Sequence, residues 1–113
     1  MIDQSIIQAA EQCLNKEIEA IKALIPRLDE NFVKVIQLIH ECKGKLVVTG
    51  VGKSGHIGSK IAATLASTGT PAFFLNPLDA YHGDLGMIGT EDVVLAISYS
   101  GATEELLRFL PLI

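Results

Sequence analysis

The sequence has no tryptophan, few aromatic residues and no long hydrophobic run. Of its 113 residues, 49% are hydrophobic and 5% are aromatic. No apolar stretch approaches the roughly 18 residues that a membrane-spanning helix needs, and no basic segment precedes an apolar run near the N-terminus. The composition therefore predicts a single small domain with a modest core, without a secretory signal or membrane segment, and we expect it in the cytoplasm.

Positive charge is also scarce, because nine Lys and Arg stand against 13 Asp and Glu. Residues 46–113 contain only Lys53, Lys60 and Arg108 as basic residues. A nucleic-acid-binding protein needs a basic face that complements the phosphate backbone, so we expect no nucleic-acid partner. An anion bound by residues 46–113 must be held by backbone N–H groups, hydroxyls and one well-placed lysine.

The two cysteines, Cys13 and Cys42, lack the CxxC or metal-ligand spacing of a zinc site. Both lie among apolar residues in segments with helical periodicity. This setting predicts reduced thiols in the core of a protein from a reducing compartment.

Glycine is nearly absent from residues 1–45, where apolar residues recur at spacings of three and four over 6–25. This pattern predicts a long helix that ends at Pro26, and a second helix that starts after Asp29 and closes at Gly44. We expect this segment, residues 1–45, to pack on the domain or on a partner subunit.

Residues 46–113 contain nine of the ten glycines and alternate between short apolar runs and helical patterns. The runs at 46–49, 72–75 and 93–97 are separated or followed by helical segments at 57–67 and 104–110. Such runs are typical of parallel strands buried on both faces. The sequence predicts an α/β fold with a three-stranded parallel sheet sandwiched by helices, preceded by an N-terminal helical segment. The apolar end at 111–113 suggests the first part of a larger domain.

Two loops directly after predicted strands are rich in small polar residues. The loop at 50–55, GVGKSG, matches the GxGxxG fingerprint, but Asn76 stands where a dinucleotide site needs an acid, and Val47 stands where a P-loop needs glycine. Both nucleotide interpretations fail on context, so we expect no cofactor. The loop at 98–103, SYSGAT, has three hydroxyls around a glycine, which favours a phosphate cradle over ordinary helix capping. Between the loops, His82 is a candidate for proton transfer or for binding sugar hydroxyls, or is a surface histidine.

Four motifs are similar to the sugar isomerase (SIS) domain of D-arabinose-5-phosphate isomerases of the KpsF/GutQ family: GVGKSGHIG at 50–58, ASTGTP at 66–71, HGDLG at 82–86 and SYSGATEE at 98–105. The resemblance implies a parallel sheet between helices and a homo-oligomer, a dimer or a tetramer. It also implies interconversion of D-ribulose 5-phosphate and D-arabinose 5-phosphate through an enediol(ate), which feeds 3-deoxy-D-manno-octulosonate synthesis for lipopolysaccharide or capsule.

The resemblance also assigns residues. It implies catalytic roles for Lys53, Glu105 and His82. The residues that it implies for binding the substrate and its phosphate are Ser54, Gly69, Thr70, His82, Ser98, Ser100, Gly101 and Thr103. Some family members have a zinc-associated histidine where Asn76 stands, so we expect no metal. A second glutamate and a histidine of the family's catalytic set lie beyond Ile113, so we expect residues 1–113 alone to be inactive. The alternative is a non-catalytic SIS module that senses a phosphosugar.

Overall fold

The structure is a computed structural model that describes residues 2–113, and it divides into two compact units, Met1–Ile36 and Gln37–Ile113. The division falls within the second helix, nine residues before the boundary that we predict at 45/46. Among residues 2–113, no helix combines the length and the apolar character needed to cross a membrane.

The first unit is helical, and its helix ends follow the sequence signals. Helix α1 (Gln4–Leu24) starts where the Asp3 carboxylate accepts a hydrogen bond from the Ser5 N–H at 2.9 Å. A 3-10 turn, η1 (Ile25–Arg27), contains Pro26 and ends the helix as predicted. Helix α2 (Glu30–His40) begins after Asp29, whose carboxylate accepts from the Asn31 N–H at 2.9 Å. The predicted cap is confirmed.

The predicted burial of the cysteines is wrong for Cys13. Its side chain is exposed on α1, and none of the residues of this helix, all of which the structure describes, is buried. Cys42 is half-buried, two residues past the end of α2, and its thiol donates to the Glu91 carbonyl at 3.4 Å. Helical periodicity identifies a stripe of apolar side chains, but it does not say what covers them.

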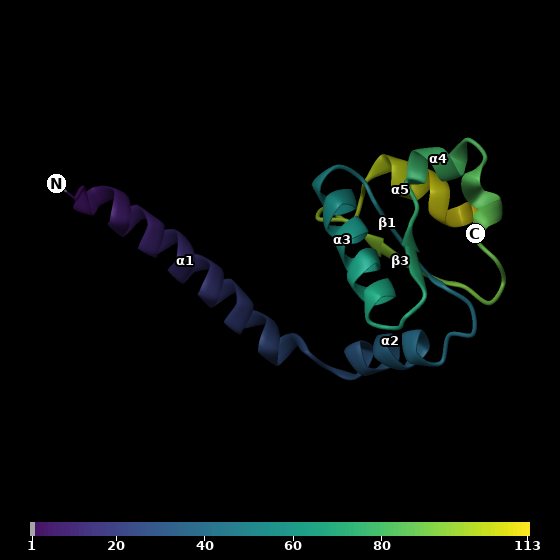
Figure 1. Cartoon of the computed structure of the whole chain (residues 1–113), viewed down its shortest axis with the longest axis horizontal. Helices are drawn as coiled ribbons and strands as arrows, with labels where there is room; N and C mark the ends of the chain where they lie inside the picture. The colour runs from purple at the N-terminus through teal and green to yellow at the C-terminus, as the bar shows by residue number, and fades with distance from the viewer. Residues whose placement is uncertain (1) are drawn as a thin grey trace. The chain divides into compact units, whose positions relative to one another are not determined.

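The second unit is built on a parallel sheet of three strands in the order β2-β1-β3 (Figure 1). The strands are β1 (Leu46–Gly50), β2 (Ala72–Phe74) and β3 (Val93–Ile97). Central strand β1 pairs with both neighbours, with Leu46 opposite Ala72 on one side and opposite Val93 on the other. All three predicted strands and the α/β class are confirmed.

Helices connect the strands and lie against both faces of the sheet. They are α3 (Lys53–Ser67), α4 (Pro77–Tyr81) and α5 (Glu104–Phe109), with 3-10 turns η2 (Asp84–Met87) and η3 (Leu110–Leu112). Helix α3 begins four residues earlier than the predicted start at Ile57. The reason is Gly52, whose φ of +61° lets the chain turn from the strand directly into the helix.

The core consists of two hydrophobic clusters, one on each face of the sheet. Val47 points to one face and packs with residues of α4 and α5, among them Ala80, Leu106 and Phe109. Val48 points to the other face and packs with Ala62 of α3. Successive side chains of a strand alternate between faces, so β1 is buried from both sides along its whole length.

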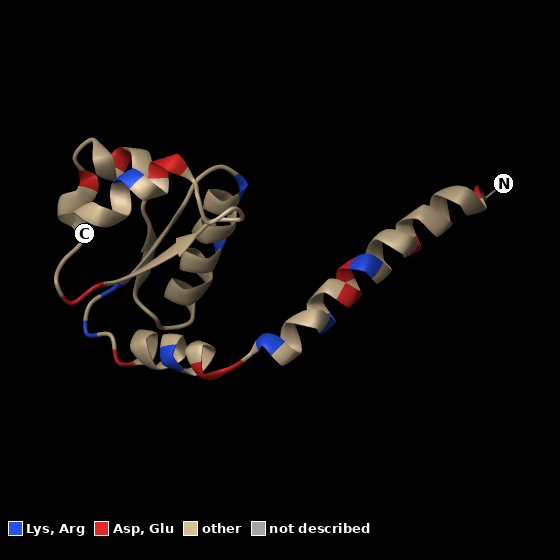
Figure 2. Cartoon of the chain, turned by 180° about the vertical axis from the view of Figure 1, so that it is seen from behind, with Lys and Arg blue, Asp and Glu red and all other residues tan. Residues whose placement is uncertain are grey.

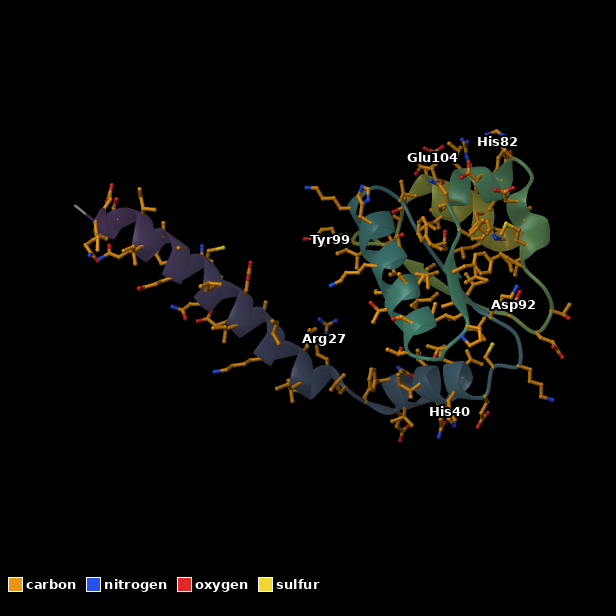
Figure 3. The ribbon with its side chains drawn as sticks, viewed as in Figure 1. Arg27, His40, His82, Asp92, Tyr99 and Glu104 are labelled. Atoms are coloured by element: carbon orange, nitrogen blue, oxygen red, sulfur yellow. The ribbon has the colours of Figure 1, made fainter. Side chains whose placement is uncertain are left out.

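The Asp92 carboxylate links the segment that leads into β1 with the segment that leads into β3. Asp92, labelled in Figure 3, accepts hydrogen bonds from the Gly89 N–H and the Lys45 N–H, both at 2.7 Å. These two donors hold the pKa of the Asp92 carboxyl below its ordinary value. A carboxyl with a lowered pKa stabilises the fold above its unfolded pKa, and this contribution is lost as the pH falls through the folded value.

The Thr49 hydroxyl is the exception in this core. Thr49 is fully buried in β1, and its Oγ1 has no hydrogen-bond partner among residues 2–113. A buried hydroxyl without a partner costs roughly 1–3 kcal/mol of desolvation, whereas an apolar side chain of the same shape does not.

We expect Thr49→Val to leave the free energy of unfolding unchanged or to raise it by up to about 2 kcal/mol, because it removes this unpaired hydroxyl. Val47→Thr, its matched control on the same face of β1, should lower the free energy by roughly 1–3 kcal/mol. Urea denaturation of both variants is the measurement. A loss of stability in Thr49→Val would mean that the hydroxyl has a partner.

Candidate functional site

Polar loops follow all three strands at one rim of the sheet, the rim formed by their carboxyl ends. The helix after β1 packs on one face, whereas α4 and α5, which follow β2 and β3, pack on the other. Where the chain leaves neighbouring strands toward opposite faces, a crevice opens beyond the strand ends, and ligands bind in such crevices. The topology therefore favours ligand sites beyond the strand ends on both sides of β1.

The β1–α3 loop brings the first turn of α3 against the end of β1. A Cβ atom on Gly55 would lie 2.8 Å from the Gly50 carbonyl oxygen, so only glycine permits this approach. Lys53 is the first residue of the helix and is exposed, and Ser54 follows it half-buried. The loop thus presents one cation and one hydroxyl at the rim.

A pocket of about 310 Å³ lies beside this loop, on the β2 side of β1. Its polar lining comes from His56, Ser59 and Asn76, and its apolar lining from Phe74. We did not include these residues among the predicted site residues. Two signals could have found them: His56 and Ser59 are three residues apart, hence on one helix face, and Asn76 follows a strand directly.

The loop at 98–103 lies on the β3 side of β1, and its hydroxyls bond within the loop. The Ser98 and Thr103 hydroxyl oxygens are 2.7 Å apart, and the Ser98 oxygen also accepts from the Gly101 N–H at 3.0 Å. The Ser100 hydroxyl accepts from the Ala102 N–H at 3.1 Å. The predicted alternative, simple capping of α5, does not describe this pattern, because Thr103 makes no side-chain cap.

Residue Tyr99, between the two serines of this loop, is fully exposed, and its side chain points away from the sheet (Figure 3). The loop is therefore shaped by its own polar groups rather than by packing. Ser100 is exposed, while Ser98 and Thr103 are half-buried.

Two acids open helix α5, and they differ in their contacts. Glu104 pairs with Arg108 one turn later at 2.7 Å, the one ion pair found among residues 2–113. Glu105 faces α4 instead, where it lines a small cavity of about 30 Å³ with Tyr81 and Arg108. Lys53 and Glu105 thus make no ion pair with each other in the described chain.

His82 lies at the far end of α4 from the rim. The helix begins at the rim, where Asn76 caps it, and its five residues span about 8 Å. His82 is exposed, and its ring meets the Tyr81 ring edge-on at 5.5 Å between centroids. The structure therefore brings His82 to the α4–α5 side of the site and not to the β1–α3 loop.

Gly69 and Thr70 lie at the opposite rim of the sheet. They follow α3, whose 15 residues run about 22 Å back to the amino end of β2. Gly69 lines a different cavity there, of about 630 Å³, together with Lys45 and Phe73. Within one chain, these two residues do not meet the loops that follow the strands.

Charge at the rim is mixed. Figure 2 shows acidic residues on α4 and α5, the helices that follow the two outer strands, and basic residues dispersed among acidic ones along the chain. In the part of the chain that the structure describes, no three His, Cys, Asp or Glu side chains gather closely enough to hold a metal ion. Hydroxyls, amides, His56 and Lys53 are among the groups that the rim offers to a ligand.

The comparisons with known proteins agree with the fold. Residues 38–113 match the family model described as the SIS domain. In structure, the chain is similar to a protein of Escherichia coli CFT073 in complex with arabinose 5-phosphate, with a TM-score of 0.91 and 44% identity over 98% of this chain and 59% of that chain.

Two curated relatives are similar in sequence. The arabinose 5-phosphate isomerase GutQ of Escherichia coli K12 is 53% identical over 110 residues, which are 97% of this chain and 34% of the relative. The arabinose 5-phosphate isomerase KdsD of Pseudomonas aeruginosa is 53% identical over 107 residues, 95% of this chain and 33% of the relative. The chain thus spans about a third of the length of these relatives.

Proposed function

The chain belongs to the SIS domain family, and from that membership we propose that it supplies the phosphosugar-binding part of an isomerase that interconverts D-ribulose 5-phosphate and D-arabinose 5-phosphate. The observation that carries the proposal is the 53% identity to arabinose 5-phosphate isomerases over 110 and 107 residues of this chain. A similar chain in complex with arabinose 5-phosphate supports the same substrate. In this proposal the isomerase works in the cytoplasm and supplies arabinose 5-phosphate for the synthesis of 3-deoxy-D-manno-octulosonate.

The phosphate is held by the loop at 98–103. Its hydrogen bonds fix the hydroxyls of Ser98, Ser100 and Thr103 in place before a ligand arrives, which lowers the entropy lost on binding. Hydroxyls and backbone N–H groups bind phosphate without full positive charges, in keeping with the single lysine at this rim. Ser54 and Gly101 belong to the same binding set.

The isomerisation removes a proton from the carbon next to the carbonyl and returns a proton to the former carbonyl carbon, through an enediol(ate), while a hydroxyl proton moves between the two oxygens. Glu105 acts as the acid/base in this part of the chain, since it leads from the phosphate loop into α5. Lys53 stabilises the negative charge that develops on the enediolate oxygens. His82 orients sugar hydroxyls or assists ring opening.

A non-catalytic SIS module that senses a phosphosugar is the second candidate. It needs the loop at 98–103 but has no use for Lys53 and Glu105 together. Their joint presence favours the enzyme.

The protein functions as a homo-oligomer, a dimer or a tetramer. The apolar stripe of α1 is exposed in the single chain, with Ile21 near its centre. A second copy of the chain that covers this stripe would bury it. A neighbouring subunit would also bring its own Gly69 and Thr70 to the rim that holds Lys53.

Replacing Ser100 with Ala should weaken the binding of arabinose 5-phosphate about tenfold or more, because a hydrogen bond to a charged phosphate is worth about 1.5–3 kcal/mol. The melting temperature should change little, since Ser100 is exposed and makes one hydrogen bond within the loop. Tyr99→Phe, which removes a hydroxyl from the exposed neighbour, is the matched control. Calorimetry that finds equal affinity in wild type and Ser100→Ala would contradict the phosphate loop.

Isomerase activity tests the proposed function itself. In a chain extended to the length of the curated relatives, Lys53→Ala and Glu105→Gln should each lower kcat about 10²- to 10⁴-fold in a coupled assay. Glu104→Gln, beside Glu105 but paired with Arg108, should retain most of the activity. Residues 1–113 alone should show little turnover, and turnover comparable to that of the extended chain would mean that all catalytic groups lie within them.

The oligomer depends on the apolar stripe of α1. Ile21→Lys should shift the mass measured by light scattering toward the monomer, because it places a charge in that stripe. Gln12→Lys adds the same charge about 180° around the helix and should leave the mass unchanged. A wild-type chain that is monomeric at every concentration would refute the oligomer.

A further inference from the structure

The pocket of His56, Ser59, Asn76 and Phe74 carries an inference beyond the phosphate loop. It lies on the β2 side of β1, while the loop at 98–103 lies on the β3 side. The two therefore occupy the two flanks of the central strand at the same rim. The question is which part of a ligand the pocket fits.

The polar groups of the pocket are available for a ligand. The Asn76 Oδ1 accepts from the Leu78 N–H at 2.9 Å as the cap of α4, which leaves the Asn76 amide NH2 to donate. Among the hydrogen bonds of residues 2–113, none involves the His56 ring or the Ser59 hydroxyl. The pocket thus offers an imidazole, a hydroxyl and an amide donor.

The lining of the pocket favours an uncharged ligand. None of the described residues that line it is Asp, Glu, Lys or Arg. Phe74 is fixed against α3, since Cβ atoms on Gly55 and Gly58 would come within 3.4 and 3.3 Å of its ring. Neutral donors and acceptors beside an aromatic surface suit a chain of hydroxyl-bearing carbons, which has apolar C–H groups as well as O–H groups.

The spacing of the two flanks matches a sugar phosphate. Neighbouring strands lie about 5 Å apart, so the ends of β2 and β3 are separated by about 10 Å across β1. A five-carbon sugar phosphate in its open form has a comparable length, with a phosphate at one end and hydroxyls at the other. We infer that His56 and Ser59 bind the uncharged, hydroxyl-bearing end of the sugar phosphate, with the Asn76 amide as a third contact. This inference rests on the proposed function.

Amide spectra of the 15N-labelled chain test the inference with three probes: arabinose 5-phosphate, D-arabinose and inorganic phosphate. Arabinose 5-phosphate should shift the signals of both flanks. D-arabinose should shift the signals of His56, Ser59 and Asn76 and not those of residues 98–103. Inorganic phosphate should shift the signals of residues 98–103 and not those of His56, Ser59 and Asn76.

Binding affinities of single-residue variants of the same chain give a second, quantitative test. His56→Ala and Ser59→Ala should each lower the affinity for arabinose 5-phosphate about threefold to tenfold, which is the effect of one lost hydrogen bond. Both variants should leave the affinity for inorganic phosphate unchanged. His40→Ala, which removes an exposed histidine outside the pocket, is the matched control. Spectra that keep the wild-type pattern outside the pocket establish that each variant is folded. Ser59→Ala removes only a hydroxyl and is the smaller structural change of the two.

The outcomes separate this inference from the proposed function. If arabinose 5-phosphate shifts only the signals of residues 98–103, and both variants keep the wild-type affinity, the inferred role of the pocket is wrong and the proposed phosphate site stands. If arabinose 5-phosphate shifts only the signals of the pocket residues, the inferred role of the pocket is supported and the proposed phosphate-binding role of residues 98–103 is wrong. No shift in either flank with arabinose 5-phosphate would overturn both.

Discussion

The close approach of α3 to the end of β1 is the constraint on which the site depends. Gly55 lies against the Gly50 carbonyl, and Gly58 lies against Val48 and the Phe74 ring. Any larger residue at Gly55 would push the helix away from the strand. The approach sets where Lys53 and His56 stand at the rim, and it holds Phe74 as a wall of the pocket. Backbone proximity, not a polar interaction, thus builds this flank of the site.

The two flanks of β1 are built differently. The β3 flank is a loop whose hydroxyls bond to one another and to its own N–H groups, so it keeps its shape without much packing. The β2 flank is a pocket between a helix and a strand end, in which the His56 and Ser59 side chains have no internal partner among the described residues. A self-supporting polar loop suits an anion, and a pocket with unused neutral groups suits hydroxyls. The proposed sugar phosphate, with one charged end and one neutral end, would use both flanks.

The two residues proposed for catalysis lie on different helices. Lys53 and Glu105 are both exposed, on helices that pack against opposite faces of the sheet. Exposed groups keep little of the strength that a dry site gives to electrostatic interactions. Under the proposed function, the chemistry therefore needs surroundings that exclude water from Lys53 and Glu105.

The sequence by itself determined the parts of the fold that depend on neighbours along the chain. Apolar runs gave three strands, Asp29 and Pro26 marked helix ends, and the motifs identified the SIS family, because periodicity, capping and loop chemistry act over a few residues. Only the tertiary structure decided which loops meet. Strand order and the crossover through α3 carry Gly69 and Thr70 to the far rim and bring Asn76 beside His56, 20 positions earlier in the sequence. Such meetings depend on strand pairing and helix packing across long separations, which no local pattern encodes.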